Sequence, residues 1–274
     1  MKDNIGLCAY AIAQVGRPYW FGTYGQFSSK KVLDEKRKSY PKYYKAKDFE
    51  NQFGYKVHDC SGLIKGYMMS PNNEAPAEYN AKYDINADTM INSCKITGTV
   101  GNIPEVGGLL VWRPGHVGVY IGNGIVIEAR GHNYGVVRSV LKNRDFKKWG
   151  VLPFIQYVGY EEFVDRLYGV FFNRDADADG EKFWVERLKN GVSTPTDVIK
   201  GFAQSAEFEN KQKDDEEYVT ILYKAFFDRE PDELAFWVNI TRTYGRSVTL
   251  DGFSMSQEWQ NTSKYITDLS CIYH

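Results

Sequence analysis

The spacing of apolar residues predicts that this chain begins with helices and continues with strands. A first helix is predicted over residues 4–15, because apolar side chains recur there at the three- and four-residue intervals of one helix face (Ile5, Cys8, Ala9, Ile12 and Val15). Gly16-Arg17-Pro18 ends this pattern. A second, shorter helix is predicted over residues 61–69.

Four apolar runs further along the chain predict strands, over residues 107–112, 117–121, 125–129 and 136–140. Gly122-Asn123-Gly124 stands between the second and third runs, and these residues tolerate the positive φ that a tight hairpin needs. The first half of the chain is therefore predicted to be α+β, with N-terminal helices packed on an antiparallel sheet.

Residues 30–47 follow neither pattern. They carry eight Lys and Arg, together with several Tyr, and show little apolar periodicity. We interpret this stretch as an insertion, partly looped, that lies near the functional site.

The second half of the chain contains an internal repeat with a period of about 51 to 55 residues. Phe163-Val164, Leu167-Tyr168, Phe171-Phe172 and Arg174 correspond to Tyr218-Val219, Leu222-Tyr223, Phe226-Phe227 and Arg229, and Phe183-Trp184-Val185 corresponds to Phe236-Trp237-Val238. The apolar spacing within each copy is helical. We therefore predict two domains, residues 1–158 and residues 159–274, the second being an all-α domain of two repeats.

Composition adds a charge boundary at the same place. The 274 residues include 43% hydrophobic residues and have a net charge of −1, but residues 1–158 carry 21 Lys and Arg against 13 Asp and Glu, and residues 159–274 carry 13 against 22. The basic half suits an anionic surface such as cell-wall polymers, or it is simply a solvated face. No nucleic-acid partner is expected. No run of about 18 apolar residues predicts a transmembrane segment, and the N-terminus lacks the layout of a signal peptide.

One of the four cysteines has a reactive setting. The spacing of Cys8, Cys60, Cys94 and Cys271 fits neither a zinc site nor a disulfide framework, and Cys8 is expected in the core. Asp59-Cys60-Ser61-Gly62 precedes the second predicted helix, which places Cys60 at a helix N-terminus, where the pKa of a thiol is lowered. Taken alone, this motif also fits a buried structural cysteine.

His116 supplies a possible base for such a thiol. It begins the strand after Pro114-Gly115, and strand geometry could bring Glu128, on the next strand, beside its ring. Glu128 stands in an apolar run and so needs a polar partner. His132 is the alternative third residue, and Glu128 is favoured.

Together these motifs resemble the NlpC/P60 family of cell-wall peptidases, a compact relative of the papain fold. The resemblance covers residues 5–157 and is carried by 16–22 (GRPYWFG), 59–62 (DCSG) and 115–124 (GHVGVYIGNG). It implies Cys60 as nucleophile, His116 as base and Tyr19 near the nucleophile as a substrate-binding residue. The motif residues Asp59 and Ser61 are expected to contact substrate as well. The family's third residue is often histidine, whereas Glu128 stands in that place here.

The function that this resemblance implies is hydrolysis of peptidoglycan stem peptides, at the bond between γ-linked D-glutamate and a diamino acid. It also implies an extracellular or cell-wall location and no required cofactor. Two alternatives remain at this stage. One is an amidase or acyltransferase on the same scaffold, and the other is a wall-binding protein whose cleft has lost activity.

The repeats resemble a DUF4214-type helical domain, for which attachment or targeting is the implied role. They also contain the spacing of a twelve-residue calcium loop, with Asp175, Asp177 and Asp179 before Gly180 and with Glu186 at the last position. The second copy has no glycine at the matching place. An acidic turn with an Asp helix cap explains the same residues.

Overall fold

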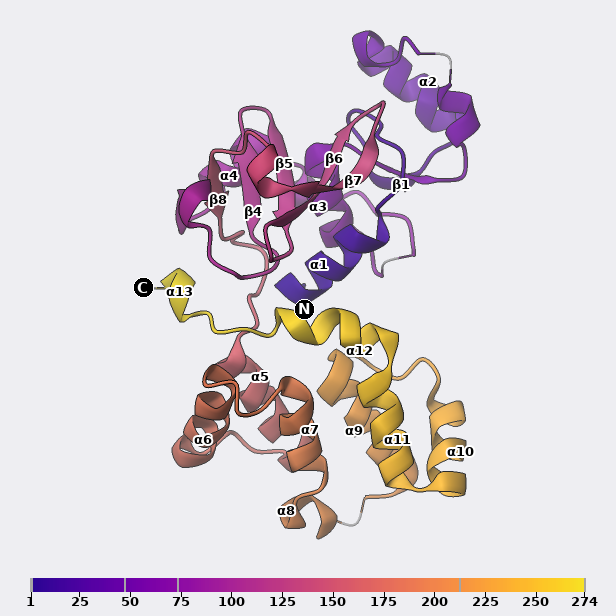
Figure 1. The fold of residues 1–274 in the computed structure, drawn as a ribbon. Helices are drawn as coiled ribbons and strands as arrows, with labels where there is room; N and C mark the ends of the chain where they lie inside the picture. Colours follow the sequence, from indigo (N-terminus) through magenta and orange to yellow (C-terminus); the bar gives the residue numbers. More distant parts are fainter. Residues whose placement is uncertain (1, 47, 73, 212, 274) are drawn as a thin grey trace. The chain divides into compact units, whose positions relative to one another are not determined.

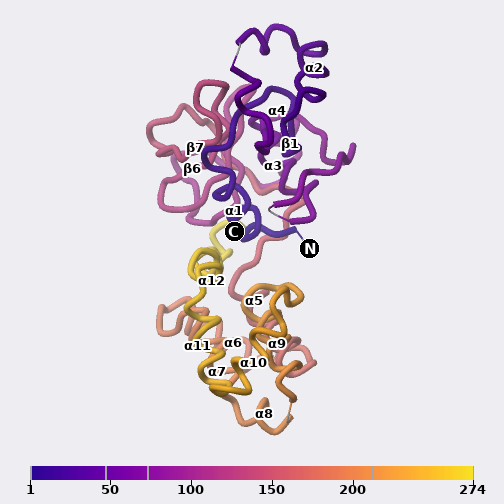
Figure 2. The backbone as a smooth tube through the Cα atoms, turned by 90° about the vertical axis from the view of Figure 1, so that its right-hand side faces the viewer, coloured from indigo at the N-terminus to yellow at the C-terminus, as the bar shows by residue number. Residues whose placement is uncertain are grey.

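The computed structural model describes residues 2–46, 48–72, 74–211 and 213–273. Within these ranges the chain forms two compact units (Figures 1 and 2), which we describe separately. The first runs to Tyr157 and also includes α13 (Ser270–Tyr273), and the second comprises Val158–Leu269. The second unit therefore ends before α13, whereas the sequence pattern placed its end at the C-terminus.

The first unit contains a six-stranded antiparallel sheet with the strand order β3-β8-β4-β5-β6-β7. Its strands are β3 (Thr97–Thr99), β4 (Leu110–Arg113), β5 (His116–Tyr120), β6 (Ile125–Gly131), β7 (Gly135–Val140) and β8 (Lys148–Gly150). The four predicted strands are β4 to β7, each within a few residues of its predicted bounds. The tight turn between β5 and β6 has positive φ at Gly122, Asn123 and Gly124, as the sequence predicts.

Helices α1 (Asn4–Ala13) and α3 (Cys60–Met69) pack against β5 and β6, and α4 (Ala87–Ser93) packs against β4 and β8. A two-stranded sheet of β1 (Tyr24–Phe27) and β2 (Lys56–His58) lies beside α3. These elements bury Leu7, Cys8, Leu63, Val117 and Val119 completely. The predicted α+β class is confirmed, and so is the core position of Cys8.

The inserted segment is more ordered than the sequence indicates. It forms α2 (Lys30–Ser39) and two 3₁₀ turns, η1 (Pro41–Tyr43) and η2 (Phe49–Gln52), and α2 lies at the outer edge of the first unit in both views (Figures 1 and 2). It has a small core of its own, made of Trp20, Leu33, Tyr44, Phe49 and Val57. Burial of these rings orders the segment although its sequence shows no apolar period.

The second unit is all-helical, as predicted. Its first repeat consists of α5 (Tyr160–Leu167) with the π-helical turn η6 (Tyr168–Phe172), followed by α6 (Ala178–Lys189), α7 (Pro195–Ala203) and α8 (Ala206–Glu209). The second repeat consists of α9 (Asp215–Phe227), α10 (Leu234–Tyr244), α11 (Arg246–Met255) and α12 (Gln257–Thr262), followed by η7 (Ser263–Tyr265).

Equivalent contacts hold both repeats together. Arg174 pairs with Glu207 at 3.1 Å, and Arg229 pairs with Glu258 at 2.9 Å. In each repeat a tryptophan ring packs on a helical glycine, at Gly201 and at Gly252, where a Cβ would come within 3 Å of the ring. The two copies therefore share one packing scheme. None of the helices in the described ranges is long and apolar enough to cross a membrane.

Candidate active site

Cys60 is the first residue of α3, as the sequence predicts. Asp59 caps the helix, because its Oδ1 accepts hydrogen bonds from the Gly62 amide at 2.6 Å and from the Ser61 hydroxyl at 3.0 Å. Cys60 is partly exposed. The sulfur thus lies at the positive end of the dipole of α3, and the first turn of this helix is stabilised by the Asp59 cap.

The turn before β1 closes tightly on this helix start. The Asp59 amide donates to the Thr23 carbonyl at 3.0 Å, and the Gly22 amide donates to Asp59 Oδ2 at 2.9 Å. A Cβ on Gly62 would lie 1.9 Å from the Thr23 carbonyl oxygen. Gly62 is therefore required by the close approach of a neighbouring backbone.

The sulfur of Cys60 meets the start of β5 at His116. Sγ lies 3.8 Å from the Gly115 carbonyl oxygen, and the backbone amide of Val117 donates a hydrogen bond to it. These two residues flank His116, so the sulfur lies against the backbone on both sides of the predicted base. The contact between Cys60 and the start of β5 depends on the packing of α3 against β5.

His116 is held from its far side by Glu128. The two side chains are buried, and His116 Nε2 lies 2.6 Å from Glu128 Oε2. They lie on the same face of the sheet as a diagonal pair across β5 and β6, and the missing side chain of Gly118 leaves the space between them. With Nε2 engaged by the carboxylate, Nδ1 is the ring nitrogen left to exchange a proton with a thiol.

Glu128 is stabilised as a carboxylate by a residue that the sequence analysis missed. Arg144 donates from Nε to Oε1 at 2.6 Å and from Nη2 to Oε2 at 3.0 Å. Burial alone would raise the pKa of Glu128, but hydrogen bonds from His116, Arg144 and Ser139 lower it to about 2. Glu128 is consequently charged at neutral pH and can stabilise a protonated imidazole.

The resting thiol is less acidic than its position at the helix start predicts. Burial and then the charge of Asp59 raise the pKa of Cys60 to about 12, while hydrogen bonds from backbone amides act in the opposite direction. Desolvation and the neighbouring carboxylate thus outweigh the helix dipole. A thiolate at this position needs a protonated His116 beside it to balance its charge.

Tyr19 lies close to this pair. Burial raises the pKa of its hydroxyl, and the charges of Asp59 and Cys60 raise it further, so the hydroxyl is within electrostatic range of the nucleophile and remains protonated at neutral pH. A neutral hydroxyl there can donate a hydrogen bond. The structure therefore groups the three predicted substrate contacts, Tyr19, Asp59 and Ser61, around Cys60.

Two other histidines are placed away from this chemistry. His132 Nε2 lies 2.9 Å from Asp48 Oδ1, and its ring packs on Phe49 in the inserted segment. His58 is completely buried two residues before Cys60, with its Nε2 2.9 Å from the Tyr10 hydroxyl. Burial lowers the pKa of His58 to about 3, so it is neutral. Neither ring holds His116.

The turn that carries His116 has a further support. Asp88 Oδ1 accepts hydrogen bonds from the Gly115 amide at 2.9 Å and from Trp112 Nε1 at 2.8 Å. The Phe146 ring stacks near His116, with ring centres 5.8 Å apart. No local motif marks these residues, because tertiary folding alone brings α4 and the segment before β8 to this turn.

Comparison with known proteins identifies the unit that carries this site. A model of the NlpC/P60 family matches residues 16–153, which include Cys60, His116 and Glu128. The chain belongs to the NlpC/P60 family. Its first unit is thus a papain-like NlpC/P60 domain. A domain of unknown function, DUF4214, matches residues 154–213 and again residues 204–263, in agreement with the two predicted repeats.

Several solved structures are similar to the NlpC/P60 unit. NlpC2 from Trichomonas vaginalis shares 16% identity over 55% of this chain and 48% of its own, with a TM-score of 0.34. The NlpC/p60 domain of the peptidoglycan hydrolase SagA shares 16% identity over 55% of this chain and 99% of its own, with a TM-score of 0.31. The peptidoglycan hydrolase RipB from Mycobacterium tuberculosis shares 20% identity over 55% of this chain and 66% of its own, with a TM-score of 0.33. This chain spans about half the length of NlpC2. No curated protein matches the chain.

Two of the predicted calcium ligands in the DUF4214 unit have other contacts in the structure. Asp177 caps α6 by accepting from the Gly180 amide at 2.8 Å, so Gly180 lies in the first helical turn instead of a cation-binding loop. Glu186 faces Lys182 at 3.9 Å further along the helix. Within the described ranges, no group of three or more His, Cys, Asp or Glu side chains is arranged to hold a metal. Calcium binding stays a prediction.

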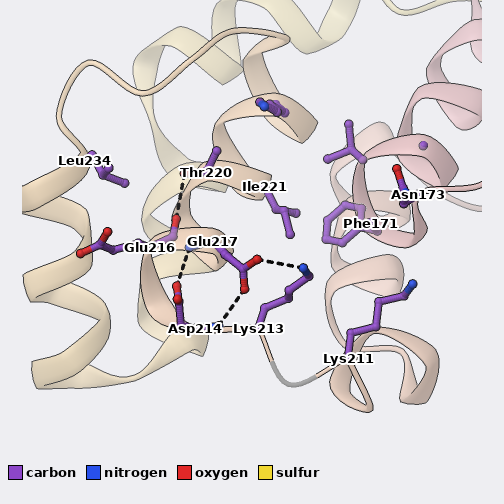
Figure 3. Close-up of a pocket in the computed structure, with 13 residues that line it drawn as sticks. Phe171, Asn173, Lys211, Lys213, Asp214, Glu216, Glu217, Thr220, Ile221 and Leu234 are labelled. Carbon is purple, nitrogen blue, oxygen red and sulfur yellow. Dashed lines mark hydrogen bonds and ion pairs between the residues drawn. The ribbon is translucent and has the colours of Figure 1, made fainter.

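A cavity of about 910 Å³ lies in the same unit, between η6 and α9 (Figure 3). Phe171 and Ile221 contribute apolar surface to it, and its charged groups largely pair within the unit. Lys213 bonds Glu217 at 3.0 Å, and Lys211 donates to the Phe172 carbonyl at 2.9 Å. This cavity lies between the two repeats, and its lining does not include Cys60, His116 or Glu128.

Proposed function

We propose that the NlpC/P60 unit is a cysteine endopeptidase that hydrolyses the peptide stems of peptidoglycan, at the bond between γ-linked D-glutamate and a diamino acid. The observation that carries this proposal is the contact of Cys60 with the start of β5, where His116 is held by Glu128. Membership of the NlpC/P60 family supports the substrate class. An extracellular or cell-wall location is part of the proposal.

The first step is proton transfer from the Cys60 thiol to His116. Because the pKa of the resting thiol is about 12, the thiolate forms together with the imidazolium and not before it. Glu128 carries a full negative charge at neutral pH and stabilises this imidazolium through the 2.6 Å contact with Nε2. The ion pair formed in this way is the attacking species.

The thiolate then adds to the carbonyl carbon of the scissile amide. The backbone amide of Cys60, at the N-terminus of α3, is positioned to stabilise the negative oxygen that develops. His116 next gives its proton to the departing amine, the C–N bond breaks, and a thioester remains on Cys60. Water then attacks the thioester while His116 accepts a proton, and this step releases the acid product and restores the thiol.

Mass spectrometry of fragments from digested peptidoglycan tests the reaction. Cleavage inside the stem gives peptide fragments with a new free amine on the diamino acid and leaves the amino sugar attached to the remaining stem. An amidase would instead separate the sugar from the whole peptide. Fragments of that second kind would overturn the endopeptidase proposal, and the absence of any release would support a binding protein that has lost activity.

For the DUF4214 unit we propose attachment to the cell wall. Phe183 and Phe236 occupy the same position in the two repeats and are 51% and 57% exposed, although the neighbouring Val185 and Val238 are buried. A solvent-facing aromatic residue that recurs at one register position is suited to binding and contributes little to the core. This duplication supports a surface with two equivalent contacts.

The attachment proposal is tested with the full chain and purified wall fragments in a sedimentation assay. We expect the variant Phe183→Ser/Phe236→Ser to lose most of its binding. Tyr244→Ser is the control, because Tyr244 is 64% exposed but Gly191 stands at its place in the first repeat. Equal binding by the double variant and the unchanged chain would leave this unit as a spacer.

A further inference from the structure

Phe21 and two rings of the inserted segment form an aromatic surface next to the loop that holds Cys60. The Phe21 and Tyr43 rings stack with their centres 3.7 Å apart and their planes 9° apart, and Tyr40 meets Phe21 edge-on at 5.2 Å. Tyr40 and Tyr43 remain 38% and 42% exposed. We call Phe21, Tyr40 and Tyr43 the aromatic wall.

The aromatic wall is joined directly to the loop that holds Cys60. Tyr40 covers Gly22, where a Cβ would lie 2.7 Å from its ring, and the Gly22 amide donates to Asp59 Oδ2 at 2.9 Å. Tyr44 donates from its hydroxyl to the Phe21 carbonyl at 2.7 Å. A single turn of chain therefore connects the wall to the cap of the nucleophile helix.

Tyr19 lies two residues before Phe21 of the wall and forms a β-bridge with His58, two residues before Cys60. Burial raises the pKa of the Tyr19 hydroxyl, and the charges of Asp59, Cys60 and Tyr43 add to the rise. Tyr19 is therefore close to Cys60 and to Tyr43 at the same time.

The wall is fixed in place before any substrate arrives. Trp20 packs in the small core of the insertion and donates from Nε1 to Gln52 Oε1 at 2.7 Å. His132 ties the insertion to the β6–β7 hairpin through its 2.9 Å contact with Asp48. A surface held by these contacts loses little conformational entropy on binding.

We propose that the aromatic wall binds the amino sugar at the head of the peptidoglycan stem peptide, which makes sugar-linked stems better substrates than free stems. This inference rests on the proposed function. A stem peptide has a pyranose at one end and charged or amidated amino acids at the other. One face of a pyranose presents C–H groups that pack on aromatic rings, and the hydroxyl and acetamide oxygens at its edge accept hydrogen bonds.

Nearby cations fit the polar edge of such a sugar. The ammonium group of Lys42 lies 4.7 Å from the centre of the Tyr43 ring, and Lys36 donates to the Gly22 carbonyl beneath the wall. Lys42 lies over the Tyr43 ring, so its ammonium group can donate to an oxygen of a sugar whose C–H face packs on the exposed part of the wall. The wall therefore combines the two kinds of contact that an amino sugar offers.

The test compares two substrates with one peptide sequence, one carrying the disaccharide and one without it. We expect the unchanged chain to prefer the sugar-linked substrate in kcat/KM, and Tyr43→Ala to reduce this preference about tenfold, which corresponds to about 1.4 kcal/mol. The loss should appear in KM with kcat unchanged, because the sugar stays bound throughout the reaction. Cleavage of the free peptide should not change.

Tyr55→Ala is the matched control, since Tyr55 lies between the insertion and β2, is 48% exposed and has the guanidinium of Arg17 over its ring. Equal losses for Tyr43→Ala on both substrates, or equal losses for both variants, would overturn the inference. A second readout separates it from the proposed function: disaccharide without peptide is titrated into Cys60→Ala protein and followed by NMR. Absence of cleavage refutes only the proposed peptidase function. Absence of disaccharide binding at millimolar concentration refutes the proposal that the aromatic wall binds the sugar.

Discussion

The support of Glu128 by Arg144 leads to a quantitative prediction about stability. Arg144→Met removes the guanidinium but keeps a side chain of similar length, and it leaves the carboxylate of Glu128 completely buried with His116 and Ser139 as its remaining partners. Removing one partner of a buried ion pair typically costs about 3–5 kcal/mol, because the other charge stays buried without compensation.

The pKa of Glu128 gives an independent magnitude. Burial opposes the shift, yet the hydrogen bonds from His116, Arg144 and Ser139 lower this pKa from 4.5 to about 2, which corresponds to about 3 kcal/mol of stability at neutral pH. This value is the net of the favourable hydrogen bonds and the opposing cost of burial, and the cost of burial remains when Arg144 is removed. We therefore expect the substitution to cost about 3 kcal/mol, the lower end of the range for a broken buried pair.

Differential scanning calorimetry on the full chain measures this loss. For a unit of this size, about 3 kcal/mol lowers the melting temperature by roughly 6–12 °C. The transition of the DUF4214 unit should stay in place and serves as an internal reference. Arg138→Met is the control, because Arg138 is exposed on β7, and a substitution at such a site changes stability by no more than about 0.5 kcal/mol.

The sign of the pH dependence provides a second check. Because the folded pKa of Glu128 lies below its unfolded value of 4.5, its contribution is complete above that value and is lost as the pH falls toward about 2. The variant has less to lose on acidification, so its difference from the unchanged chain should shrink between pH 5 and pH 3. A melting temperature within 2 °C of the unchanged chain at pH 7, or a gap that persists undiminished at pH 3, would refute the buried-pair explanation.

Three other predictions follow from the placement of individual side chains. Glu128→Ala should lower kcat by about 10²–10⁴-fold while His132→Ala retains most activity on the free peptide, and the reverse order in a steady-state assay would make His132 the third catalytic residue. Asp88→Ala should lower kcat by about 10- to 100-fold with little change in melting temperature, because Trp112 and Gly115 lose their hydrogen bonds to Asp88. An unchanged kcat would show that the turn before His116 keeps its position without Asp88. Calcium at millimolar concentration should raise the melting temperature of the DUF4214 unit if the loop from Asp175 to Glu186 binds it, and a temperature unmoved by calcium or chelator would remove that prediction.

Local sequence was sufficient to predict which side chains form the candidate site. Cys60 was recognisable from a cap residue before a helix, His116 from a strand after a Pro-Gly turn, and Glu128 from a lone carboxylate in an apolar strand joined by a hairpin. The alternation of the strands then placed His116 and Glu128 on one face, where the structure finds them 2.6 Å apart. When two strands are joined by a short hairpin, the alternation of side chains along each strand is enough to predict which residues share a face.

The partners that arrive from elsewhere in the chain were not predictable. Arg144 comes from 16 residues after Glu128, and Asp88 from 27 residues before Gly115, and no pattern in either segment points to the site. Tertiary packing also changed the expected acidity of Cys60, because burial and Asp59 raise the pKa of its thiol despite the helix dipole. Such effects depend on distances that a sequence does not contain.

Ambiguous local patterns explain the remaining differences. Residues 30–47 were expected to be partly looped, but Leu33 and Tyr44 pack with Phe49 around Trp20 and form a core although their spacing shows no periodicity. The acidic run before α6 has the spacing of a calcium loop, and in the structure its Asp177 caps a helix. Calcium binding by this run stays a prediction. In both places one sequence pattern is compatible with two structures.

The proposed role of Cys60 is tested most directly by intact-mass spectrometry of the protein mixed with excess sugar-linked stem peptide and quenched in acid. The unchanged chain should gain the mass of the acyl fragment, digestion should map that mass to Cys60, and Cys60→Ala should neither gain mass nor release product. Product release by Cys60→Ala at the rate of the unchanged chain, or an adduct that maps to another residue, would contradict the thiolate mechanism.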